Sequence, residues 1–84
     1  MSAFNERLRE ARIESSFSQR DMAARFGITD RSYRRWEAGD AEPSIDAMVE
    51  LADLFGVSLD WLCGRCLEET FEEHRRGLRE HPRF

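Results

Sequence analysis

A single glycine divides residues 17–39 into two short amphipathic segments, and this division constrains the fold more than any other feature. Ser18 can cap the first segment with its hydroxyl oxygen. Gly27 then ends this segment, because glycine enters the left-handed conformation without a steric cost. Thr29 caps a second segment, which we expect at residues 30–38. The stretch therefore predicts two helices joined by a tight turn.

Apolar residues at helical spacing predict further helices on both sides of this pair. We expect a first helix at residues 3–14, a fourth at 45–55, and a short fifth helix after the cap at Ser58. A thinner apolar stripe predicts a helix at about 67–79. The apolar face of the fourth helix is expected to comprise Ile45, Met48, Leu51, Ala52 and Phe55.

The size of the chain limits it to one small domain. With 84 residues and 40% hydrophobic content, we expect an all-α five-helix domain at residues 1–64 and a helical extension at residues 65–84. No window approaches the roughly 18 consecutive apolar residues of a membrane span, and residues 1–10 do not resemble a signal peptide. We therefore expect a cytoplasmic protein with no membrane partner.

Charge is distributed unevenly along the chain. The formal net charge is −4, which argues against non-specific coating of nucleic acid. Three arginines nevertheless fall within residues 27–39, whereas residues 40–60 contain six carboxylates and no basic residue. Evenly solvated surface charge is the alternative interpretation. We interpret the segregation as a basic face on the second helix of the pair.

The second helix of the pair has two chemically distinct sides. Tyr33 and Trp36 share one side, which we assign to the core rather than to stacking on bases. The other side carries Asp30 and the three arginines. Because the major groove of DNA admits one helix and arginine binds the guanine edge with two hydrogen bonds, the pattern predicts double-stranded DNA as the partner. The basic residues are Arg31, Arg34 and Arg35.

The order and spacing of several segments resemble the lambda-repressor/Cro (XRE-type) helix-turn-helix family. These segments are RLREAR, FSQRDMAARFGIT, RSYRRWEAG, the dipeptide PS at positions 43–44, and MVELADLFGVSLDWL. The resemblance implies base-facing positions at Asp30, Arg31 and Arg35, and we expect Ser32, at the groove edge, to read bases with them. It also implies contacts to the DNA backbone from Gln19, Thr29 and Arg34, and a buried ion pair between Arg12 and Glu37. The helix N-terminus predicts a backbone contact at Ser18 as well. Nothing nucleophilic lies near Glu37 in sequence, so we do not expect a catalytic carboxylate.

Members of this family are commonly homodimers that act as repressors or activators at palindromic operators. We expect a homodimer, with an exposed tryptophan and neighbouring apolar residues as its contact: Leu59, Trp61, Leu62, Leu67 and Phe71. One departure from the family is the loop at residues 40–42, which is acidic where relatives are often basic. This loop predicts weaker non-specific binding and a shallower dependence on salt.

Two other functions are compatible with the sequence. An interaction module of the antitoxin type would bind a protein partner through the acidic and C-terminal surface.

The pair Cys63 and Cys66 also has the spacing of a redox or zinc motif, with His74 and His81 downstream. Their spacing does not match a usual zinc site, so we expect two ordinary thiols, no metal and no cofactor. No nucleophile and base stand together, so we do not expect an enzyme.

Overall fold

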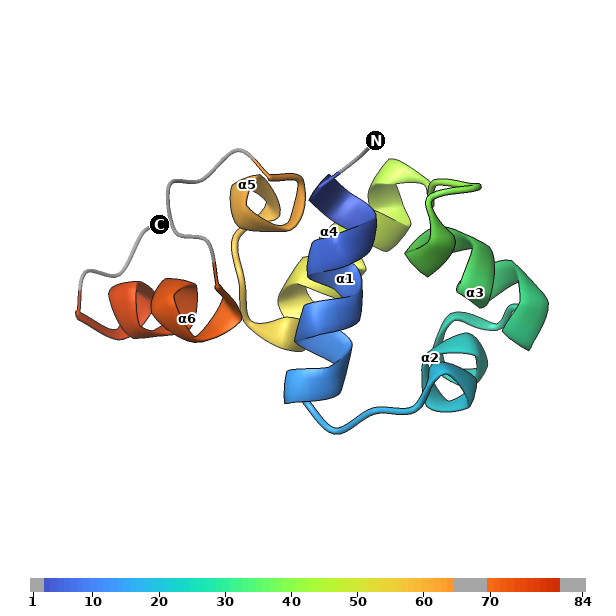
Figure 1. Cartoon of the computed structure of the whole chain (residues 1–84), viewed down its shortest axis with the longest axis horizontal. Helices are drawn as coiled ribbons and strands as arrows, with labels where there is room; N and C mark the ends of the chain where they lie inside the picture. Colours follow the sequence, from blue (N-terminus) through green and yellow to red (C-terminus); the bar gives the residue numbers. More distant parts are fainter. Residues whose placement is uncertain (1–2, 65–69, 81–84) are drawn as a thin grey trace.

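The computed structural model describes residues 3–64 and 70–80, and within them the chain is entirely helical (Figure 1). No strand occurs in this part of the chain. The all-α fold class predicted from the sequence is therefore confirmed. The helices are α1 (Ala3–Glu14), α2 (Gln19–Phe26), α3 (Asp30–Ala38), α4 (Ile45–Phe55), α5 (Leu59–Leu62) and α6 (Phe71–Glu80).

Side-chain caps explain where the helices begin. At α2 the Asp21 N–H donates to Ser18 Oγ and the Ser18 N–H donates to Asp21 Oδ2, each over 2.9 Å, which forms a capping box. This bond from the Ser18 backbone holds the pKa of the Asp21 carboxyl below its usual value. The hydroxyls of Thr29, Ser44 and Ser58 cap α3, α4 and α5 in the same position.

The helices surround one core. Figure 1 shows α1 crossing in front of α4, with α2 and α3 on one side and α6 at the opposite end. Removal of these apolar side chains from water is the main stabilising contribution to a domain of this size. The largest fully buried apolar side chains come from five helices: Leu8, Met22, Tyr33, Leu51, Phe55, Trp61 and Leu62.

The first turn of α4 departs from the predicted core. Phe55 and Leu51 are buried and Met48 is half-buried, but Ile45 is 75% exposed. Burial thus decreases steadily toward the N-terminus of α4, where the helix extends beyond the packed core. The assignment of Ile45 to the buried face was wrong for this reason.

The C-terminal helix begins later than predicted and packs against the domain. It starts at Phe71 instead of about residue 67, and Phe71 is only 8% exposed. The Phe71 N–H donates to Glu10 Oε2 of α1 over 2.8 Å, so a carboxylate on one helix caps the start of another. The apolar stripe of this segment therefore contributes to the core through Phe71.

Trp61 lies beneath this helix. Its side chain is 0% exposed, with the Phe71 ring at 5.9 Å and the His74 ring stacked on it at 5.6 Å. The prediction of an exposed tryptophan was therefore wrong, because α6 of the same chain covers it. Leu62 is also fully buried, while Leu59 is 38% exposed. Leu67, also predicted at the dimer contact, lies outside the described residues.

His74, which the sequence analysis considered only beside the cysteine motif, is a core residue. It is fully buried, and its Nε2 accepts a hydrogen bond from the Ser58 N–H at 2.9 Å. Together with Phe71, three residues earlier, it forms the inward face of α6. The available signal was this spacing, but histidine is more often exposed than fully buried.

Candidate nucleic-acid interface

The exposed side of α3 carries the predicted base-reading residues. Thr29 Oγ1 accepts from the Ser32 N–H at 3.1 Å and donates to Ser32 Oγ at 3.0 Å, which fixes the start of the helix. Asp30 and Arg31 occupy the first turn and are exposed. An exposed N-terminal turn with free polar side chains is the part of a helix that can reach base edges in the major groove.

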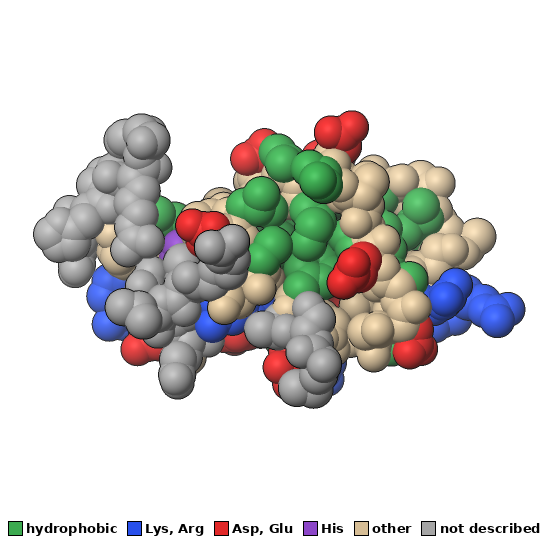
Figure 2. Space-filling model, turned by 90° about the horizontal axis from the view of Figure 1, so that it is seen from above, with side chains coloured by type: hydrophobic (Ala, Val, Ile, Leu, Met, Phe, Trp, Pro, Cys, Tyr) green, Lys and Arg blue, Asp and Glu red, His purple; other side chains and the backbone are tan. Residues whose placement is uncertain are grey.

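The two later arginines extend this side by one turn. Arg34 is exposed. Arg35 is exposed as well, and its Nη2 lies 3.4 Å from the Asp40 carbonyl oxygen, a long contact beyond the C-terminus of α3. Figure 2 shows basic side chains projecting from the end of the molecule at which α3 lies. The buried side of the same helix is formed by Tyr33, Trp36 and Glu37.

The buried Glu37 carboxylate connects three helices. Arg12 of α1 donates from Nε to Oε2 at 2.6 Å and from Nη2 to Oε1 at 3.1 Å. The Tyr33 hydroxyl donates to Oε2 at 2.5 Å, and Gln19 Nε2 of α2 donates to Oε1 at 3.1 Å. The structure thus contains the ion pair that the family resemblance implied, and α1, α2 and α3 are held by one carboxylate.

These bonds also determine the protonation of the site. Burial acts to raise the pKa of the Glu37 carboxyl, but the hydrogen bonds from Arg12, Tyr33 and Gln19 outweigh it, so the pKa lies below its usual value. The bond to Glu37 raises the pKa of the Arg12 guanidinium. Burial, followed by the bond to Glu37, raises the pKa of the Tyr33 hydroxyl. Glu37 is therefore ionised at neutral pH.

The N-terminus of α2 presents backbone groups more than side chains. The amide nitrogen of Gln19 is directed to Glu37, and the hydroxyl of Ser18 accepts from Asp21 in the capping box. Both side chains therefore have partners inside the protein. The free N–H groups of the first turn remain as anion donors, as at other helix N-termini.

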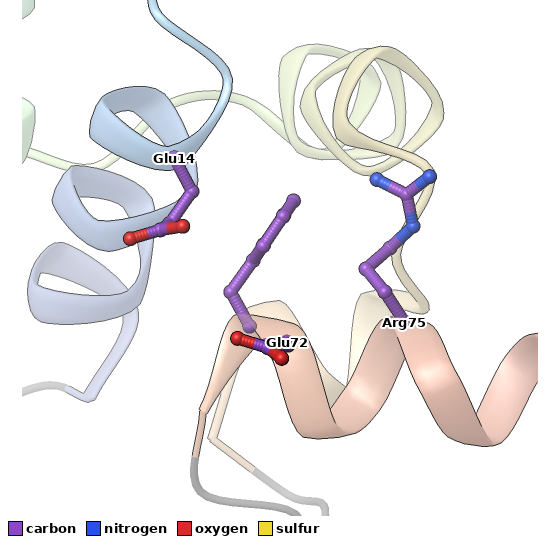
Figure 3. Close-up of a pocket in the computed structure, with 4 residues that line it drawn as sticks. Glu14, Glu72 and Arg75 are labelled. Carbon is purple, nitrogen blue, oxygen red and sulfur yellow. The ribbon is translucent and has the colours of Figure 1, made fainter.

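A pocket of about 320 Å³ lies between the end of α1 and α6 (Figure 3). Glu14, Phe71, Glu72 and Arg75 line it. Arg75 Nη1 donates to the Phe55 carbonyl oxygen at 2.9 Å, and its guanidinium lies 5.4 Å from the centre of the Phe71 ring. These contacts hold α6 against the C-terminus of α4, so we assign the pocket to the docking of α6.

The cysteine motif gains no second feature from the structure. Cys63 is half-buried, and Cys66 and His81 lie outside the described residues. Across residues 3–64 and 70–80, no three side chains of His, Cys, Asp or Glu are grouped as metal ligands. The described helices are also all too short or too polar to cross a bilayer.

Known proteins resemble this chain over the region just described. A helix-turn-helix family model matches residues 8–62. A prophage-derived helix-turn-helix transcriptional regulator of Bacillus subtilis, YonR, is 41% identical over 59 residues, 70% of this chain. The regulator YqaE of the same organism is 30% identical over 94% of the chain. The cryptic phage CTXphi transcriptional repressor RstR of Vibrio cholerae is 35% identical over 81% of it.

The matched segments span 55%, 69% and 61% of the lengths of YonR, YqaE and RstR. The family match begins within α1 and ends at the last residue of α5, so it includes α2, α3 and the Glu37 carboxylate and excludes α6. From this match and these relatives, the chain belongs to the lambda-repressor-like (XRE-type) helix-turn-helix family of transcriptional regulators.

Proposed function

We propose that this protein regulates transcription by placing α3 in the major groove of a specific DNA operator. The observation that carries the proposal is the exposed row of arginines on a helix whose other side is fixed by Glu37. Arg31 and Arg35 bind guanine edges, Asp30 accepts from cytosine, and Ser32 lies beside them. Arg34 and Thr29 contact the sugar-phosphate backbone at the groove edge.

The side chains of Ser18 and Gln19 have partners inside the protein. The contact to phosphate at the start of α2 is therefore made mainly by backbone N–H groups of its first turn. This division separates residues that position the protein from residues that read sequence. It follows that substitution of Gln19 affects the angle between α2 and α3 as well as any contact to DNA.

We further propose that the protein acts as a homodimeric repressor at a palindromic site. RstR, one of the similar proteins, is named as a transcriptional repressor. Of the residues predicted at the dimer contact, Leu59 remains exposed, whereas Trp61, Leu62 and Phe71 are buried within the chain. Selection of bound duplexes from a random library is the direct test. A dimer yields a palindrome with half-sites about 10 bp apart, and a single half-site contradicts it.

Substitution of the reading arginines tests the proposed contacts. Arg31→Ala and Arg35→Ala are each expected to weaken binding to the selected duplex about 5- to 150-fold, the loss of one bidentate pair. Arg76→Ala on α6, at the other end of the molecule in Figure 1, is the matched control and should leave affinity unchanged. Unchanged affinity in both α3 variants, with melting temperatures equal to that of the parent, would contradict the proposed readout.

A further inference from the structure

One side of α4 combines exposed aliphatic side chains with carboxylates. Ile45 and Val49 stand four residues apart, so they are neighbours on the helix surface, and they are 75% and 43% exposed. Asp46, Glu50 and Asp53 are exposed and follow on the adjacent side of the helix at 3.6 residues per turn. We call these five residues the α4 outer face. Figure 2 shows hydrophobic side chains gathered near the middle of the view, with acidic ones beside them.

Folding does not account for this composition. Isoleucine and valine are weaker helix formers than alanine, glutamate or lysine, and Ile45, which is 75% exposed, gains little from burial. Asp46 and Glu50 are four residues apart and Glu50 and Asp53 three apart, so like charges repel along the helix. Residues 40–60 contain no basic side chain to offset this repulsion. Asp46 is offset by its place in the first turn, where the helix dipole favours a carboxylate. The exposed Ile45 and the repulsion between Glu50 and Asp53 lower the stability of α4, so they point to binding.

The chemistry of the face defines what it can bind. A complementary partner presents an apolar group that covers Ile45 and Val49, and beside it a cation that pairs with the carboxylates. A second copy related by a twofold axis would place the same face on itself and bring the carboxylates together. The phosphates of DNA and of anionic lipids are repelled for the same reason. Charge complementarity therefore favours a basic, partly apolar protein segment.

We propose that the α4 outer face docks a basic amphipathic segment of another protein. Its apolar residues lie against Ile45 and Val49, and its lysines or arginines lie against Asp46, Glu50 and Asp53. This contact goes beyond the proposed operator binding and does not depend on it. Basic side chains project from the end of the molecule at which α2 and α3 lie, whereas hydrophobic side chains gather near the middle of the view (Figure 2).

A designed peptide serves as the probe. It is helical, carries two leucines four residues apart, and has lysines along the adjacent side, while a control peptide has glutamate in place of each lysine. The full chain is titrated with each peptide by calorimetry, and backbone amide shifts are recorded by NMR. The lysine peptide is expected to bind and to shift amides of α4, and the glutamate peptide is not.

Variants then assign the contact. Ile45→Ser is expected to weaken peptide binding about tenfold or more, since a buried aliphatic contact is lost. Glu50→Gln should weaken it about threefold, an effect that decreases at high salt. Ile13→Ser is the matched control, because Ile13 is 47% exposed on α1 and lies outside the face. All three sites are exposed, and melting curves confirm that each variant is folded.

Three outcomes would overturn the proposal. One is equal loss of peptide binding in Ile45→Ser and Ile13→Ser. Another is a set of amide shifts that lies away from α4. The third is a wild-type dimer in sedimentation that becomes a monomer in Ile45→Ser, because the occupant would then be a second copy. Operator affinity is measured on the same variants and is expected to be unchanged, so failure of this contact is distinguishable from failure of DNA binding.

Discussion

At the scale of single residues, Ser16 occupies a position that favours glycine. Its φ is +64°, whereas the corresponding residue after α2 is Gly27, with φ +65°. In both places the next residue donates its N–H to a carbonyl five residues earlier, from Phe17 to Arg12 and from Ile28 to Ala23. This is the bonding of a Schellman motif, which requires a left-handed residue.

Ser16→Gly is therefore expected to stabilise the protein by up to about 1 kcal/mol, since the steric cost of a left-handed serine is removed. The free energy of unfolding from urea titration measures the effect. Ser15→Gly is the control. Ser15 does not have a positive φ, so a glycine there only adds conformational freedom to the unfolded chain. If both variants are destabilised equally, the strain at Ser16 is absent.

Glu37 gives a pH-dependent prediction at the same scale. Its pKa in the folded state is below the ordinary value of 4.5. Ionised Glu37 therefore stabilises the fold fully above about pH 4.5, and this contribution is lost as the pH falls through the lowered pKa. Glu37→Gln should reduce stability at pH 7 by about 3 kcal/mol, because the Arg12 charge loses its partner.

The difference in unfolding free energy between wild type and Glu37→Gln is measured from pH 7 to pH 3. It is expected to narrow below about pH 4.5, since the carboxyl of the wild type then becomes neutral. Glu14→Gln, at an exposed carboxylate on the same side of the domain as α6, should show little difference throughout. If the difference in unfolding free energy between the two proteins stays constant from pH 7 to pH 3, ionisation of Glu37 does not contribute to the pH dependence of stability.

At the scale of secondary-structure elements, α6 is attached by a few specific contacts. Glu10 caps its first turn, His74 stacks on Trp61 and accepts from Ser58, and Arg75 binds the carbonyl at the end of α4. We expect an element held in this way to separate from the domain before the other helices unfold. Loss of the His74 side chain would also remove the acceptor of the Ser58 N–H.

His74→Ala is expected to weaken the docking of α6 by roughly 2–4 kcal/mol, from the cavity under the ring and the lost hydrogen bond. Hydrogen exchange of the α6 amides should accelerate, while the amides of α1 to α4 keep most of their protection. Arg76→Ala is the control, because its only described partner is the exposed Glu72. Unchanged exchange of α6 in His74→Ala would show that other contacts hold this helix.

At the scale of the whole molecule, the charges are sorted by position. Arginines lie on the exposed side of α3, and the carboxylates of residues 40–60 follow directly after it. We expect a protein of net charge −4 to approach DNA with the exposed arginine side of α3 foremost. In the proposed complex the acidic loop after α3 lies close to phosphate, so we expect it to oppose non-specific binding.

Glu42→Lys is expected to raise affinity for any duplex and to steepen the slope of log affinity against log salt by about 1. Glu42 is exposed in the loop after α3. Glu72→Lys makes the same charge change on α6, at the opposite end in Figure 1, and should leave the slope nearly unchanged. Equal slopes in the two variants would place the loop away from the DNA backbone.

Local signals in the sequence predicted most of the helices. The bounds of α1, α3 and α4 agree with the predicted ranges. For α3 and α4 the reason is that the caps at Thr29 and Ser44 and the glycines that follow the helices act over a few residues. The arginines of α3 were also assigned correctly to its exposed side, since Tyr33 and Trp36 fix the buried one. Their contact with DNA stays a prediction.

Which surfaces meet was decided only by the tertiary structure. Trp61 is buried because α6 returns to α1 and α5, and Ile45 is exposed because the core does not extend to the start of α4. The amide of Gln19 reaches Glu37 across 18 positions of sequence. The sequence by itself therefore determined the helices and their polar sides, which depend on neighbouring residues. Burial and long-range pairing depend on how distant segments pack together, and a short sequence pattern contains no information about those distant segments.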